Sequence, residues 1–219
     1  MISTSLAPSR QTTKHVAVFA SVTIAGALYF ALAILVLHFL RPDLNPISQP
    51  TSAYAVGSYS YLLMTSAFFS MSVASFALVA ALYQGVPQQA RSRLGLALLT
   101  GWAVGVFIAM IFPMDADGAP QTISGTIHQT AGPLTFLTLT LGMILLSWRF
   151  RQDAKWLPLY RTALVLSLVM LVAFLATFIG FVTGAGFMGL TQRIALATAV
   201  TWMLLIAIRL RSLVLKNEV

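Results

Sequence analysis

The sequence contains no cysteine and few charged residues. Only 8% of its 219 residues are charged, whereas soluble globular chains contain roughly 25% charged residues. The absence of cysteine excludes disulfides, thiolate metal sites and cysteine nucleophiles. Hydrophobic residues make up 58% of the chain, and the mean hydropathy is +0.88. This composition cannot cover a water-facing surface, so we predict a membrane protein without a separate soluble domain.

Acidic residues are scarcer than basic ones. The chain has five acids against 13 lysines and arginines, which gives a formal net charge of +8. The basic residues lie between long apolar runs and form no continuous patch. We therefore interpret them as topology signals, and we expect no nucleic-acid partner.

Six segments are long and apolar enough to cross a hydrocarbon core, which takes about 20 residues. They are residues 16–39, 62–83, 94–112, 127–148, 157–182 and 190–208. In hydrocarbon every backbone amide must be bonded within its own segment, so each span is predicted to be a helix. The fold class that follows is an all-α polytopic bundle of six transmembrane helices. It comprises a short basic N-terminus (1–15), one six-helix domain (16–210) and a tail (211–219).

Lysine and arginine also predict the orientation of the bundle. If the N-terminus is cytoplasmic, 11 of the 13 basic residues fall in inner segments, and only Arg41 and Arg193 fall outside. Cytoplasmic loops carry an excess of basic residues, so both ends of the chain are predicted to be inside. We expect the first span to stay attached, because it is longer than a signal-peptide core and no small-residue cleavage site follows it.

Small residues at four-residue spacing predict close contacts between helices. They are Ser66, Ser70 and Ala74 in the second span, Gly101 and Gly105 in the third, and Gly180 and Gly184 near the end of the fifth. Such faces are common in membrane bundles, so we expect a packing role for them.

Polar residues concentrate in two segments on the predicted outer side, residues 38–61 and 112–128. These segments contain three of the five acids and two of the three histidines. Any ionisable site is therefore expected at the outer face. Three prolines at four-residue steps discourage a long helix in the first segment, and we expect the loop from His38 to Gly57 to pack across the bundle mouth near Asp115 and His128. The candidate site residues are His38, Arg41, Asp43, Ser52, Tyr54, Asp115, Asp117, His128 and Arg193.

Two motifs in these segments resemble a known family. The first is R-P-D-L-N-P-I-S-Q-P-T-S-A-Y-A-V-G, from Arg41 to Gly57, and the second is F-P-M-D, from Phe112, followed by G-T-I-H, which ends at His128. Over nearly the whole chain the sequence resembles the membrane proteins filed as domain of unknown function 998. The family pattern has an acid where this chain has Ala53, so a role for that carboxylate does not carry over. The resemblance implies six helices in a bacterial or archaeal cytoplasmic membrane, and no established activity.

The ionisable candidates allow a specific hypothesis. Asp115 follows the third span and His128 lies near the start of the fourth, so we expect them to form one site at the mouth of a helical hairpin. Arg193 is the expected counter-charge of this site, and an anionic headgroup is its alternative partner. His38 is expected to be a weaker member of the same site. The alternative for each is structural: Asp115 and Asp117 in a plain turn, and His38 and Arg193 as interfacial side chains.

Four classes of function remain to be compared. An outward-facing site that handles a lipid or a small molecule, as an enzyme or as a carrier, explains the clustering of polar residues best. A zinc hydrolase of this class lacks a third outer histidine, because His15 lies on the cytoplasmic side. A haem-binding electron carrier would use His38 and His128 as axial ligands, although His38 lies close to the end of its span.

The main alternative is a structural or partner-binding protein with no turnover. An ion-coupled transporter ranks last, because no acid lies in mid-span. Membrane lipids are expected partners, and a small molecule, a lipid or a protein is an open alternative at the outer face. The sequence assigns no metal, cofactor, catalytic residue or oligomeric state.

The orientation can be tested directly with short epitope tags. Tags at residue 1, after Gln88, after Asp153 and at Val219 should report the cytoplasm, and tags near Thr51, Ala119 and Gly186 should report the outside, because basic loops resist translocation. Labelling of any inner tag by an impermeant reagent in intact cells would contradict the orientation.

Overall fold

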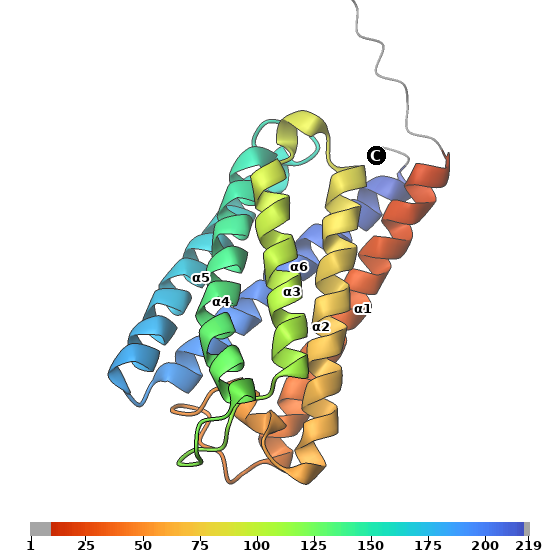
Figure 1. Cartoon of the computed structure of the whole chain (residues 1–219). Helices are drawn as coiled ribbons and strands as arrows, with labels where there is room; N and C mark the ends of the chain where they lie inside the picture. Colours follow the sequence, from red (N-terminus) through yellow and green to blue (C-terminus); the bar gives the residue numbers. More distant parts are fainter. Residues whose placement is uncertain (1–9, 217–219) are drawn as a thin grey trace, which may run out of the picture.

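Six long helices account for most of the chain. The structure is a computed structural model that describes residues 10–216. Within that range it has no strand, and six of its helices are long and apolar enough to cross a membrane, which confirms the predicted all-α bundle (Figure 1). The helices are α1 (Arg10–Leu40), α2 (Ser58–Gly85), α3 (Arg93–Ile111), α4 (Ile123–Phe150), α5 (Leu157–Thr183) and α6 (Met188–Leu215), with short 3-10 helices η1 (Thr51–Ala55) and η2 (Gln88–Ala90).

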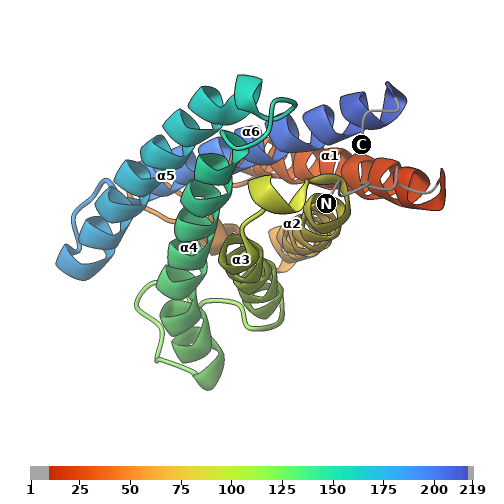
Figure 2. The ribbon, with the colours of Figure 1, turned by 90° about the horizontal axis from the view of Figure 1, so that it is seen from above.

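The helices form a closed ring. Each one packs against the helices before and after it in the chain, and α6 closes the ring by packing on α1 (Figure 2). We call the end with segments 41–57, 112–122 and 184–187 the loop end, and the end with segments 86–92 and 151–156 the basic end. Both ends of the described chain lie at the basic end, at the top of Figure 1. Which side of the membrane each end faces stays a prediction.

The helices extend beyond the predicted apolar spans where polar or buried residues continue them. Helix α4 begins four residues before the expected Ile127, because the Thr122 hydroxyl accepts a hydrogen bond from the Gly125 N–H at 3.0 Å and caps the helix. Helix α6 continues past the expected Ile208, since Leu210, Leu213 and Val214 stay buried. Hydropathy alone therefore underestimates both helices.

Two buried tryptophans fix the packing inside the ring. The indole N–H of Trp102 donates to the Ser75 hydroxyl at 2.9 Å, and that of Trp202 donates to the Ser147 hydroxyl at 2.9 Å. A buried indole N–H that lacks an acceptor is costly, so each pair fixes how its two helices face each other.

The small residues predicted to pack do so at most positions. A side chain at Gly26 would meet Ala74 at 2.8 Å and the Ser70 carbonyl at 2.9 Å, so α1 and α2 approach closely here. Gly101 and Gly105 face α4, as expected. The prediction is wrong for Gly184, which has a φ of +69° and no neighbour within 4 Å of a built Cβ. It ends α5 in a left-handed conformation and takes no part in helix packing.

The contact between α3 and α4 gives a matched pair of variants. A Cβ at Gly105 would lie 2.0 Å from Thr135 Oγ1, whereas a Cβ at Gly101 would meet Thr138 at an ordinary 3.4 Å. We expect Gly105→Ala to lower the stability by about 1–3 kcal/mol, since the helices must separate, and Gly101→Ala to have little effect. Thermal unfolding in detergent measures the difference, and equal unfolding temperatures for the two variants would contradict the packing.

Candidate functional site

The segment 41–57 covers the loop end of the bundle. All five residues of η1 are buried. The backbone N–H and the hydroxyl of Thr51 both donate to Gln192 Oε1, at 2.7 and 3.0 Å, and the Leu190 N–H donates to the Ile47 carbonyl at 2.9 Å. These bonds join the segment to the start of α6, so it packs across the bundle mouth as the sequence predicts.

The two loop-end segments also contact each other. Gln49 Nε2 donates to the Asp117 carboxylate at 2.8 Å, and the Ser52 hydroxyl donates to the Met114 sulfur at 3.2 Å. The first loop therefore meets the second at Asp117 and Met114, next to the predicted Asp115.

Arg41 holds the two ends of segment 41–57 together. Its Nε and Nη2 donate to the Asp43 carboxylate, with a shortest distance of 2.7 Å. Its Nη1 donates to the Val56 carbonyl and, at 3.0 Å, to the Ser60 hydroxyl. The hydrogen bond between the side chains raises the pKa of Arg41 and lowers the pKa of Asp43. Because their polar atoms are engaged with each other, this candidate pair stabilises the loop.

Arg193 is the centre of a second cluster at the loop end. Its Nε donates to His38 Nε2 at 3.0 Å, and its Nη2 donates to the Tyr54 hydroxyl at 2.9 Å. Its Nη1 donates to the carbonyls of Pro46, Gln49 and Gly189, at 2.8, 2.7 and 3.0 Å. Arg193 is thus the partner of His38 and of the loop backbone, which corrects its expected role as counter-charge to Asp115 and His128.

The same contacts fix the protonation pattern of His38. A guanidinium only donates, so His38 Nε2 accepts, and the ring proton lies on Nδ1, which donates to the Ile34 carbonyl at 2.7 Å. Both ring nitrogens are therefore engaged, and His38 has none left for zinc or haem iron. Within residues 10–216 no three side chains of His, Asp or Glu come together as a metal ligand set.

The expected pair of Asp115 and His128 is not formed. The Asp115 carboxylate accepts from the backbone N–H and the hydroxyl of Thr122, at 2.9 and 2.7 Å, and these bonds lower the pKa of Asp115. These two hydrogen bonds stabilise the folded protein at a pH above the ordinary carboxyl pKa. This stabilisation is lost as the pH falls through the lowered pKa of Asp115. His128 Nδ1 instead donates to the Phe112 carbonyl at 2.8 Å. Because α4 starts earlier than predicted, Asp115 binds the residue that caps it.

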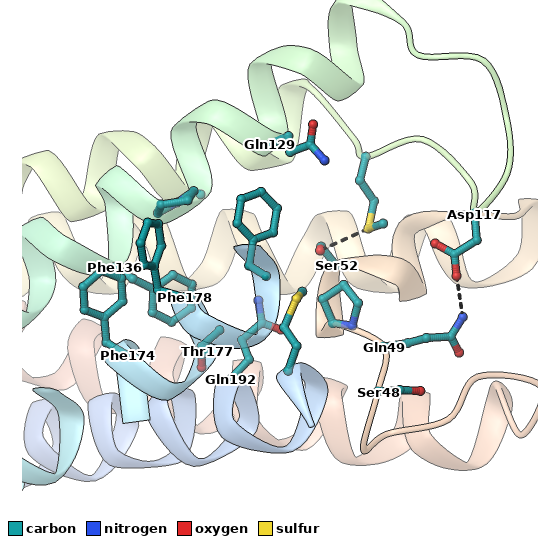
Figure 3. A pocket seen from close by; sticks show the side chains of 16 residues that line it. Ser48, Gln49, Ser52, Asp117, Gln129, Phe136, Phe174, Thr177, Phe178 and Gln192 are labelled. Atoms are coloured by element: carbon teal, nitrogen blue, oxygen red, sulfur yellow. Dashed lines mark hydrogen bonds between the residues drawn. The ribbon is translucent and has the colours of Figure 1, made fainter. Parts of the chain in front are cut away.

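A cavity of about 380 Å³ lies beneath the two loops, between α4, α5 and α6 (Figure 3). Figure 3 shows Ser48, Gln49, Ser52 and Asp117 toward one end of this loop-end pocket, and Phe136, Phe174 and Phe178, with Thr177 beside them, toward the other. Its polar lining consists of Ser48, Gln49, Ser52, Asp117, Gln129, Thr177 and Gln192, and its phenylalanines are Phe136, Phe174, Phe178 and Phe181. Two of the sequence candidates, Ser52 and Asp117, are among these residues.

A smaller cavity of about 70 Å³ adjoins the loop-end pocket inside the bundle. The two share Gly132, Phe136 and Gln192, and His128 lines the smaller one. The candidates are therefore distributed over separate places: His38, Tyr54 and Arg193 together, Arg41 with Asp43, Asp115 at the start of α4, and His128 at the inner cavity.

Sequence reasoning missed most of the pocket lining. Glutamines and phenylalanines within apolar spans are common, so they gave no signal by themselves. One signal was available at Pro133, which lies inside α4. A proline has no N–H, so the Gln129 carbonyl has no partner within the helix, and both residues line the pocket.

The lining residues offer few groups for acid-base or nucleophilic chemistry. The Ser52 hydroxyl donates to a thioether, and a serine nucleophile needs a base at that position. Asp117 is the one ionisable side chain among the lining residues. The lining can donate and accept hydrogen bonds at one end and contact apolar groups at the other.

Replacement of Arg193 tests the central cluster. Arg193→Met leaves His38, Tyr54 and three carbonyls without their donor, so we expect a loss of about 2–4 kcal/mol in stability and faster proteolysis of segment 41–57. Arg209→Met is the matched control on the same helix, because Arg209 donates only to the Lys155 carbonyl. Thermal unfolding and limited proteolysis in detergent measure both effects. Equal losses in the two variants would contradict the role given to Arg193.

Comparison with known proteins gives a family and no activity. The chain matches no curated protein and no solved structure. A family model described as "Protein of unknown function (DUF998)" matches residues 24–209, which include the whole of α2 to α5 and most of α1 and α6. The chain therefore belongs to this family of proteins of unknown function, as its two loop motifs indicate.

Proposed function

We propose that the protein binds an amphiphilic molecule, a lipid or a small molecule, in the loop-end pocket. The observation that carries the proposal is the separation of polar and aromatic side chains along one cavity (Figure 3). Ligand sites are concave, mostly apolar and equipped with a few placed polar groups. At about 380 Å³ the pocket has the size of such a site. With the orientation predicted from the basic residues, it opens to the outside of the membrane.

The free hydrogen-bonding groups of the pocket favour an uncharged or cationic head. Gln192 Oε1 accepts twice from Thr51, so the remaining capacity of this amide is its N–H donors. The Gln129 carbonyl beside Pro133 and the Asp117 carboxylate are acceptors. A head with hydroxyl, amide or amine groups satisfies both kinds, whereas a phosphate would face the carboxylate without a cation among the lining residues.

The phenylalanine end favours an apolar tail. Phe136, Phe174 and Phe178, from α4 and α5, lie together at this end of the cavity (Figure 3). Contact with them removes apolar surface of a ligand from water, which contributes about 25 cal/mol for each Å² that is buried. An amphiphile with a short chain therefore matches both ends of the pocket.

The pocket wall offers a variant that fills the cavity without a clash. A Cβ built at Gly132 has no neighbour within 4 Å. We expect Gly132→Leu to extend into the pocket and to weaken binding by at least roughly tenfold, or about 1.4 kcal/mol. Gly132→Ala is the matched control, because it changes the backbone before Pro133 in the same way and fills little of the space.

The probes are three molecules with one twelve-carbon chain each and different heads: dodecylamine, monolauroylglycerol and dodecyl phosphate. Their binding to the full chain in lipid nanodiscs is measured as a shift in unfolding temperature and by native mass spectrometry. The amine and the glyceride should bind the wild type and Gly132→Ala, and should bind Gly132→Leu weakly. Binding of none of the probes, or equal binding to Gly132→Leu, would overturn the proposal and favour a structural role.

A further inference from the structure

A third cavity lies at the basic end, and its lining is basic, whereas the loop-end pocket has an acid and no basic residue in its lining. The volume of this third cavity is about 340 Å³, and it lies where the turn after α2, the start of α3 and the end of α4 meet. Its lining residues are Gln88, Arg91, Ser92, Arg93 and Arg149. We call it the arginine cavity. Three of its five lining residues carry a guanidinium, and none carries a carboxylate.

The guanidiniums of this cavity are largely unpaired within the described chain. Arg91 donates to the Tyr83 carbonyl and lies over the Tyr83 ring, with 4.4 Å from its guanidinium carbon to the ring centroid. Arg149 Nε is buried and has no hydrogen-bond partner in the part of the chain that the structure describes. A buried charged donor without an acceptor costs free energy, so the described chain leaves the Arg149 guanidinium incompletely paired.

The only acid described at this end is engaged elsewhere. The Asp153 carboxylate accepts from Gln89 Nε2 at 3.4 Å and from the Lys155 backbone N–H at 2.9 Å. It does not line the arginine cavity. No carboxylate among residues 10–216 therefore neutralises the three arginines.

The position of Arg93 adds a second unfavourable electrostatic contribution to the free energy of this end of the bundle. Arg93 is the first residue of α3, and the first turn of this helix contains no acid. The N-terminal end of a helix carries a partial positive charge, so a cation there is repelled and an anion is attracted. The excess of basic residues in cytoplasmic loops accounts for the presence of arginines at this end. It does not account for three of them facing one cavity at the start of a helix.

We propose that the arginine cavity binds a phosphate group. Guanidiniums match phosphate oxygens with paired, charge-assisted hydrogen bonds, and an anion here offsets the positive charge of Arg91, Arg93 and Arg149. The phosphate belongs either to a lipid headgroup or to a soluble phosphorylated compound. The cavity lies at the ends of α2, α3 and α4, which is the level of the lipid headgroups in a membrane-spanning bundle, so both sources reach it. This site is independent of the loop-end pocket, which lies at the other end of the helices.

The experiment compares two sources of phosphate on the full chain. In one arm, the protein is purified from vesicles of phosphatidylcholine with 20% phosphatidylglycerol (roughly one lipid in five, enough for an anionic surface), and retained lipid is identified by native mass spectrometry. In the other arm, inorganic phosphate is added to protein in phosphatidylcholine nanodiscs at constant ionic strength, and the unfolding temperature is recorded. Retained phosphatidylglycerol identifies a headgroup site, and stabilisation by inorganic phosphate identifies a soluble ligand.

The variants separate a built site from general positive charge. Arg93→Gln with Arg149→Gln removes two guanidiniums of the cavity, and we expect binding to weaken roughly 25-fold, from about fivefold per arginine. Arg93→Gln alone changes an exposed side chain, so it keeps the test valid if the double variant does not fold.

The controls are Arg151→Gln and Arg211→Gln, which remove exposed charges of the same end that do not line the cavity. Binding should be unchanged in both. Equal weakening in cavity variants and controls, or no phosphate effect in either arm with the wild type, would overturn the proposal.

Discussion

The arrangement of the loop end depends on the donors of a single guanidinium. Arg193, on α6, reaches His38 on α1, Tyr54 in η1 and three backbone carbonyls. Most of these groups lie more than a hundred residues from Arg193 along the chain. Arg193 therefore joins α6 to α1 and to the segment 41–57. Without this centre the segment 41–57 would have to satisfy its carbonyls with water, and the roof of the loop-end pocket would not be fixed.

A second property of this cluster is that Arg193 bonds no carboxylate of the described chain. Its acceptors are carbonyl oxygens, a phenol oxygen and an imidazole nitrogen. Gly189 makes the arrangement possible, because a Cβ there would lie 2.3 Å from the Gln49 carbonyl oxygen and would push the loop away from α6. The roof is therefore held by Arg193 and Arg41 from two sides, whether or not a ligand is present. Such a preformed roof is what the geometry of a binding pocket requires.

Much of the fold could be predicted from the sequence, and less of the site. The spans follow from hydropathy, and the contact of Gly105 with α4 follows from small-residue spacing, because both depend on local sequence. The pairing of polar side chains depends on distant contacts. His38 and Arg193 are 155 positions apart, and nothing in either segment indicates the other. The sequence predicts a pair of Asp115 and His128, whereas α4 begins earlier than hydropathy indicates and Asp115 binds its cap, Thr122. This cap is a short-range signal that hydropathy does not contain.

The walls of the loop-end pocket differ in mechanical compliance. The roof is cross-linked by two arginines, whereas the α4 wall contains Gly132 and Pro133, where one backbone hydrogen bond of the helix is absent. Bending a helix at such a point disrupts no further bond, so deformation of the pocket concentrates on this wall. The inner cavity lies directly behind it and shares Gly132 and Phe136. Under the proposed function, a bulkier guest would therefore be accommodated by bending of α4 at this wall, with the roof left in place.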